Sequence, residues 1–152
     1  MFAKLCSTAA GVVVAAIGLG ALSTALADEA KRIVVVERAT TDTITDLGAK
    51  GDSSGDILTF ANDIYDESNT NKIGSDNGWC VRTVVGEAWE CIWTTTLGKG
   101  QITVEGPFYD KKDSVLAVTG GTGEFAEARG EMALHARDSK GSAYDFSYSL
   151  RE

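Results

Sequence analysis

The chain is poor in the residue types that hydrolytic and metal-dependent sites need. It has 152 residues but only one histidine, His135, and no nucleophile elbow, because its G-x-S-x-G match over residues 51–55 (GDSSG) lies in a polar segment with no helix after it. Zinc sites usually require several His or Cys ligands. The acidic residues of the polar segments lack EF-hand spacing, so we interpret them as solvated side chains rather than calcium ligands. We interpret His135 as a surface or hydrogen-bonded residue and expect no metal site.

Basic residues are also scarce. The sequence has 14 Lys and Arg against 22 Asp and Glu, which gives a net charge of −8. An acidic surface repels nucleic acids and anionic membranes. We therefore expect no nucleic-acid partner, and the charge needs no explanation beyond the solubility of an exported protein.

Long apolar runs are absent except near the N-terminus, where GVVVAAIGLGAL covers residues 11–22. Lys4 precedes this run, and Ala25-Leu26-Ala27 follows it as a small-x-small site. This order is typical of a cleavable signal peptide over residues 1–27, with cleavage before Asp28. The alternative, an uncleaved anchor, is disfavoured because the run is short for a membrane span. We expect an extracellular or periplasmic protein.

Only three cysteines are present, and removal of the signal peptide leaves Cys80 and Cys91. An oxidising compartment favours a disulfide between them. A hairpin turn centred on Val85-Gly86 places the two residues directly opposite, within bridging reach. The alternative is a pair of buried free thiols.

Residues 28–152 are long enough for one domain, and we find no helical period of useful length in them. Runs rich in β-branched and aromatic residues are separated by polar or glycine-containing turns. The expected strands are 31–38, 56–65, 79–85, 88–97, 101–108, 114–119, 131–137 and 143–150, with long polar loops at 39–55 and 66–78.

Eight strands joined mostly by short turns favour an all-β fold, an antiparallel up-and-down barrel of eight strands with room for one ligand. A sandwich would need longer crossovers late in the chain. Residues 120–123 (GGTG) lack the P-loop ending and a following helix, so we interpret them as a tight corner that needs positive φ and close backbone approach.

Asn62 is the polar exception on a strand face that it shares with Leu58, Phe60 and Ile64. A buried amide needs partners, which leaves two interpretations: a structural bond to a loop, or an anchor for a ligand or a water molecule. Arg129 and Glu131, beside the glycine corner, form either an ion pair or a substrate acid/base group.

The sequence resembles the allene oxide cyclase and dirigent barrel superfamily from about Ile33 onwards. The resemblance is carried by four segments in matching order: 55–62 with 64–66, 78–81 (GWCV), 101–109 (QITVEGPFY) and 115–130 (VLAVTGGTGEFAEARG). It implies an eight-stranded barrel with a hydrophobic cavity, a homo-oligomeric state (dimer or trimer), and neither a metal nor an organic cofactor.

The resemblance also implies site residues. Asn62 stands where the cyclases have a water-holding Asn, and Cys80 where they have a cavity Cys. Phe108 stands where they have a Tyr. Val34 and Val36 stand, in an ungapped alignment, where the first strand of the family carries a Glu and an Asn. Dirigent proteins use acidic residues and an Arg near the glycine corner, for which the nearest positions are Glu124, Arg129 and Asp56.

Two functions remain open at this point. The first is a secreted barrel that binds a small hydrophobic molecule, oxylipin-like or phenolic, and directs the stereochemistry of its cyclisation or coupling. Its expected catalytic residues are Asn62 and Arg129, and its expected ligand-binding residues are Phe60, Asn62, Cys80 and Phe108. The second is a non-catalytic carrier or secreted interaction protein on the same barrel.

Overall fold

A computed structural model describes residues 30–151, so the expected signal peptide and its cleavage site lie outside the described residues. Every regular element in this range is a strand, and the range contains no helix long and apolar enough to cross a membrane. The strands are β1 (Lys31–Arg38), β2 (Thr43–Thr45), β3 (Ile57–Phe60), β4 (Asp63–Asp66), β5 (Lys72–Val84), β6 (Ala88–Leu97), β7 (Gly100–Tyr109), β8 (Ser114–Gly123), β9 (Arg129–Ala136) and β10 (Ala143–Arg151).

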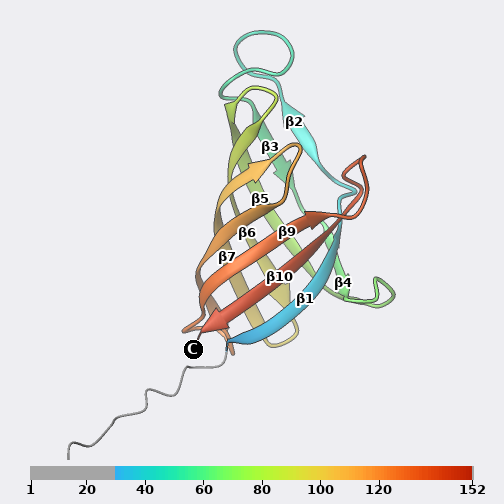
Figure 1. Ribbon diagram of the computed structural model, residues 1–152, viewed down its shortest axis with the longest axis vertical. Coiled ribbons are helices and arrows are strands. Elements are labelled where there is room, and N and C mark those ends of the chain that lie inside the picture. Colours follow the sequence, from blue (N-terminus) through green and yellow to red (C-terminus); the bar gives the residue numbers. More distant parts are fainter. Residues whose placement is uncertain (1–29, 152) are drawn as a thin grey trace, which may run out of the picture.

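These strands close into an antiparallel barrel, as Figure 1 shows. The hydrogen-bonded order is β2-β3-β5-β4-β1-β10-β9-β8-β7-β6, and the pairing of β5 with β6 completes the ring. β1 and β2 follow one another in one position of the wall, and β3 and β4 do so in the next. The ten segments therefore fill eight wall positions, which confirms the predicted eight-stranded barrel.

The strand expected over residues 56–65 is broken, which corrects the prediction. β3 ends at Phe60 and β4 begins at Asp63, while the segment expected to be a loop over 39–55 contains β2. Both breaks lie at one level of the wall, because β1 pairs with β4 below them and β2 pairs with β3 above them. The two neighbouring wall strands kink together.

The loop expected over residues 66–78 was also predicted too long, because β5 already begins at Lys72. The polar and glycine-rich stretch 72–78 lowered its apparent β propensity. Its glycines have a packing reason: a Cβ at Gly78 would lie 2.2 Å from the Cβ of Trp93 on the neighbouring strand. Close approach of two strands at a bulky tryptophan therefore overrides local propensity here.

The corner expected at residues 120–123 lies further along the chain, because β8 extends to Gly123 rather than ending at Thr119 and the turn occupies residues 124–128. A Cβ at Gly121 would lie 2.4 Å from the carbonyl oxygens of Gln101 and Phe125, and Gly123 has φ +61°. Both values describe the close approach and positive φ that glycine permits. The corner turns Phe125 and Ala128 into the barrel interior, where they are buried in the core.

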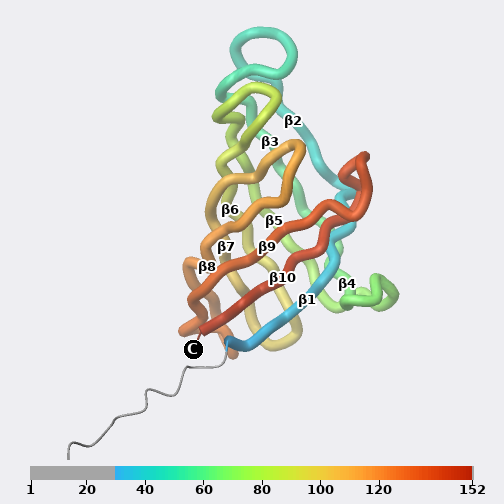
Figure 2. Tube along the Cα trace, viewed as in Figure 1, coloured from blue at the N-terminus to red at the C-terminus, as the bar shows by residue number. Residues whose placement is uncertain are grey.

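The barrel therefore has two different ends, which can be followed in Figure 2. The end with Lys31, Arg151 and the corner 124–128 is called the closed end, because Phe125 and Ala128 fill it. The other end carries the loop 46–56, which joins β2 to β3, and the turns 85–87, 110–113 and 137–142. It is called the open end, because the cavities described below lie there.

Candidate functional site: an apolar cavity with buried carboxyl groups

An internal cavity of about 50 Å³ lies towards the open end. Its size allows a few water molecules or a small apolar group. The wall is mostly aromatic and aliphatic, with two carboxyl side chains and one phenol as its polar members; it comprises Glu37, Asp42, Leu58, Phe60, Cys80, Cys91, Trp93, Phe108, Leu134, Tyr144 and Phe146.

A larger space of about 750 Å³ lies between the turns that join β7 to β8 and β9 to β10. It shares Phe108, Leu134 and Tyr144 with the internal cavity, so these three side chains separate the inner space from the outer one. The rings of Phe108 and Tyr144 meet edge to face, with centroids 5.9 Å apart. A rotamer change of this pair would join the two spaces without any change in the backbone of the wall.

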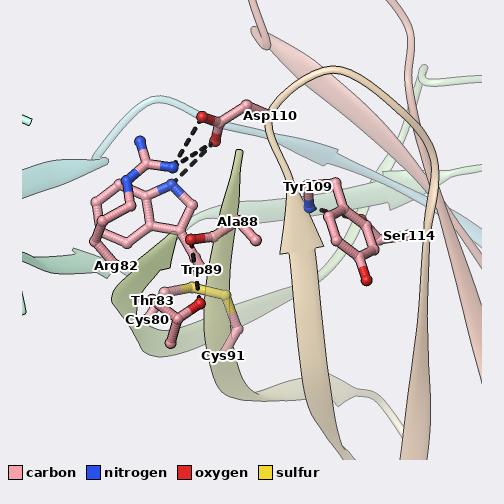
Figure 3. Close-up of a disulfide and its surroundings, with 9 residues drawn as sticks. All are labelled: Cys80, Arg82, Thr83, Ala88, Trp89, Cys91, Tyr109, Asp110 and Ser114. Atoms are coloured by element: carbon pink, nitrogen blue, oxygen red, sulfur yellow. Dashed lines mark hydrogen bonds and ion pairs between the residues drawn. A yellow bond between two sulfur atoms is a disulfide. The ribbon is translucent and has the colours of Figure 1, made fainter. Parts of the chain in front are cut away.

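The predicted disulfide between Cys80 and Cys91 is present (Figure 3). The two residues are direct partners in the register of β5 and β6, with Cα atoms 4.0 Å apart. Both line the inner cavity. Cys80 therefore contributes a disulfide sulfur to the wall and has no free thiol.

The side chain of Asn62 is saturated by bonds within the protein. Its Oδ1 accepts hydrogen bonds from the backbone N–H groups of Thr40 and Thr41 and from the Thr41 hydroxyl, each at 2.9 Å. Its Nδ2 donates to Oε1 of Glu37 and to Oδ1 of Asp42, both at 2.8 Å. Asn62 thus joins the two kinked strands and orients two carboxyl groups of the cavity wall.

A third carboxyl group, that of Asp76 on β5, lies behind this network. Its Oδ1 accepts a hydrogen bond from the backbone N–H of Asn62 at 3.1 Å. Its Oδ2 has no hydrogen-bond donor among the described residues when Glu37 is ionised. Burial, followed by the negative charge of Asp76, raises the pKa of Glu37 well above its usual range. Burial is also the main reason why the pKa of Asp76 rises to about 6.

The chemical consequence is that the neutral form of Glu37 is favoured, because its carboxyl group is buried in a mostly apolar space. A carboxyl group with a strongly raised pKa keeps its proton at neutral pH and can donate it to a ligand. The hydroxyl of Tyr144 is a second donor, because burial is the main cause that raises its pKa to about 12. The cavity therefore presents hydrogen-bond donors next to apolar walls.

The rim of the open end is fixed by Arg82, whose side chain is only 8 % exposed. Figure 3 shows its bonds to both carboxylate oxygens of Asp110, at 2.9 and 2.8 Å, beside the Trp89 ring on which the guanidinium lies. Arg82 also pairs with Asp52 at 2.7 Å. These contacts tie the loop 46–56 to the turn after β7, which also lines the outer space beside Tyr144.

The predicted site residues divide between the two ends. Phe60, Cys80 and Phe108 line the cavity, and Asn62 adjoins it through Glu37 and Asp42.

Arg129 lies at the closed end, is exposed and donates only to the Ala128 carbonyl, at 3.4 Å. No ion pair joins it to Glu131 within residues 30–151, and Glu124 pairs with Lys99 at that same end. The structure therefore brings Asn62 together with the three ligand-binding candidates and leaves Arg129 apart.

The sequence interpretation missed Glu37. Side chains of β1 alternate between faces, and Ile33 and Val35 pack into the core. Glu37 shares their face, whereas Val34 and Val36 point to the other side of the wall. The positions named from the ungapped alignment therefore do not face the cavity, and simple alternation from Val35 would have identified the buried acid.

Fold and cavity together define an eight-stranded antiparallel barrel that encloses an apolar space. The sequence model of the allene oxide cyclase family matches residues 32–139, so the chain belongs to the allene oxide cyclase family.

Solved structures with the same fold include three proteins of different activities. A pyocyanin demethylase is 24% identical, with a TM-score of 0.66, over 76% of this chain and 98% of that one. A pterocarpan synthase dirigent protein is 13% identical, with a TM-score of 0.63, over 79% and 92%. The exo-specific intermolecular Diels-Alderase AbnU is 16% identical, with a TM-score of 0.63, over 80% and 98%. At these identities the likeness shows the fold alone.

Proposed function

We propose that the protein binds a small hydrophobic metabolite at the open end and directs the geometry of its cyclisation or coupling. The observation that carries the proposal is the buried carboxyl group of Glu37, which has no cationic partner among residues 30–151 and lies in the wall of a mostly apolar cavity. Burying an acid without a cationic partner costs stability, and such costs are typical of functional sites. Structural neighbours named as a dirigent protein and a Diels-Alderase support the same class of chemistry.

The mechanism would combine confinement with one proton donor. The rings of Phe60, Trp93 and Phe146 form a continuous aromatic wall, with centroid separations of 5.9 and 5.5 Å. Such a wall restricts a flexible reactant to few conformers, which removes part of the entropic barrier. Glu37 would donate its hydrogen bond, or its proton, to an oxygen atom that gains electron density during the reaction.

The size of the inner cavity favours a second candidate, a carrier without catalytic activity. At about 50 Å³ it is far smaller than the roughly 300 to 1,000 Å³ of typical ligand pockets. A ligand must therefore occupy the outer space as well, or must displace the Phe108–Tyr144 pair. A protein that only carries its ligand in the outer space would not need the acid of Glu37.

Native mass spectrometry of the exported protein, after exposure to a lipid and phenolic extract, tests the proposal. We expect a retained small molecule in the wild type and in Arg129→Ala, and its loss in Leu58→Trp, which fills the cavity. The ligand identified in this way then serves in turnover assays. If the protein is an enzyme, Glu37→Gln should retain the ligand and lose turnover. If the wild type retains the ligand but does not convert it, the protein is a carrier. Retention that survives Leu58→Trp would contradict the site.

The proposal includes export and self-association. The disulfide is compatible with an oxidising compartment, and a mature mass that begins at Asp28 would establish cleavage. Trp79 is 49% exposed on the outer face of the wall, beside Ile92 on the neighbouring strand. A partly apolar outer face of this kind is suited to contact with a second copy, and the same native spectra report whether two or three chains associate.

A further inference from the structure

Glu37 and Asp76 are two buried acids on neighbouring parts of the wall, and the cavity explains the burial of Glu37 alone. Glu37 lines the cavity and is 6% exposed, whereas Asp76 is 2% exposed and does not reach the cavity. Both carboxyl groups accept a hydrogen bond from Asn62, Glu37 from Nδ2 at 2.8 Å and Asp76 from the backbone N–H at 3.1 Å, and neither pairs with a basic side chain among residues 30–151. Two buried carboxyl groups held by the same residue repel each other when both are ionised, which favours retention of one proton by the pair.

We infer that Asp76 is a positioning residue that holds the proton on Glu37, so that the cavity presents a neutral acid to its ligand. This inference rests on the proposed function. Asp76 has one oxygen fixed by the backbone N–H of Asn62, and its other oxygen is left for the hydroxyl of Glu37. Glu37 in turn has Oε1 occupied by Nδ2 of Asn62. The proton therefore resides on the remaining oxygen of Glu37.

The proton has two positions that are chemically distinct. In the resting protein the Glu37 hydroxyl donates to Asp76. In the reaction its O–H bond breaks as a bond to hydrogen forms on the ligand, and the negative charge left on Glu37 is stabilised by the N–H of Asn62. The ligand returns a proton to Glu37 as the product forms, so no proton is consumed overall. The negative Asp76 disfavours a second negative charge beside it and so promotes this return.

Other charged or titratable groups also face Glu37. Asp42 lies on the loop after β1 and shares the amide of Asn62, and it also raises the pKa of Glu37, by less than Asp76. Tyr144 is the cross-strand partner of Glu37 on β10. Tyr148, deeper on β10, forms a hydrogen bond with Thr95 at 2.8 Å, and its pKa is raised mainly by burial and also by Asp76 and Glu37. None of these residues is a cation, so Asp76 and burial determine the protonation of Glu37.

Carboxyl ¹³C NMR of the full exported chain, without any ligand, tests the inference. Labelled Glu side chains are titrated from pH 4 to pH 9, and the signal lost in Glu37→Gln identifies Glu37. We expect Glu37 to remain protonated at pH 7 in the wild type, to titrate at lower pH in Asp76→Asn, and to shift less in Asp42→Asn. Thr95→Val, a neutral change at the cross-strand position of Asp76, should leave the titration midpoint unchanged.

An unchanged Glu37 midpoint in folded Asp76→Asn would overturn the inference, as would an ordinary Glu midpoint in the wild type. If Asp76→Asn does not fold, Asp76→Glu replaces it: it keeps the charge, and it should keep the high midpoint. Because the titration uses no ligand, its outcome is independent of whether the binding proposal succeeds.

Discussion

The two ends of the barrel use the same strands for opposite purposes. At the closed end the chain turns Phe125 and Ala128 inward, and the polar groups there, such as the ion pair of Lys99 with Glu124 at 3.3 Å, stay in solvent. At the open end the interior contains Glu37, Asn62 and other polar side chains. Apolar groups fill the closed end, which favours stability. The open end buries acids, which lowers the free energy of unfolding. The difference supports the placement of the proposed site at the open end.

The largest expected loss of stability follows a substitution in the core of the closed end. Phe125→Ala removes a ring that is 4% exposed and leaves a cavity, so we expect a loss of about 4 kcal/mol in the free energy of unfolding. Urea denaturation measures the loss. Ligand retention by the folded fraction should be unchanged, because no residue of the corner lines the open-end cavities. A loss of ligand with stability preserved would reverse the assignment of the ends.

The next largest loss of stability is expected when the hydrogen-bond network of Asn62 at the open end is removed. Asn62→Ala removes five side-chain hydrogen bonds and leaves buried donors and acceptors without partners. We expect a loss of about 3 kcal/mol in stability, measured by the same denaturation, together with weaker ligand retention. Asn77→Ala, at an exposed position of β5, is the matched control and should change stability by less than about 0.5 kcal/mol. Equal effects of the two variants would show that the network is unimportant.

A smaller effect concerns pH. The folded pKa values of Asp76, about 6, and of Glu37 lie above their unfolded values, so the folded chain binds more protons in that range. Their contribution to stability is therefore complete below about pH 4 and is lost as the pH rises through the folded pKa values. Asp76→Asn should be more stable than the wild type by about 2 kcal/mol at pH 8, and the advantage should vanish at pH 4. A constant difference across this range would show that Asp76 ionises normally.

The smallest effect is expected at Arg129. Its exposed guanidinium donates one long bond at the closed end. Arg129→Ala should therefore change the free energy of unfolding by less than about 0.5 kcal/mol and should leave ligand retention unaltered. Calorimetry and native mass spectrometry together check both statements. A loss of turnover in Arg129→Ala would restore this residue to the catalytic role expected from the sequence.

The barrel could be predicted because apolar and polar side chains alternate with a period of two in the regular, unbroken strands. β6 was predicted at its exact bounds, and the opposition of Cys80 and Cys91 followed from one turn position. The kink at Asn62 was missed because a side chain replaces the backbone ladder there, which periodicity does not reveal.

The site was only partly predictable for the same reason. Phe60 and Phe108 were found because large aromatic residues signal an interior. Glu37 was missed because its burial depends on Asn62 and Asp76, which come from other strands. A charged residue on a strand is usually exposed, and only the tertiary network overrides that expectation.

The most direct test of the central claim is an NMR titration of the methyl-labelled protein with 2-naphthol, a small neutral aromatic compound. Leu58 and Leu134 line the open-end cavity, whereas Leu150 is buried near the closed end. The account predicts saturable shifts of the Leu58 and Leu134 methyl signals with the Leu150 signals unmoved. Shifts confined to Leu150, or no saturable shift at Leu58 and Leu134, would contradict it.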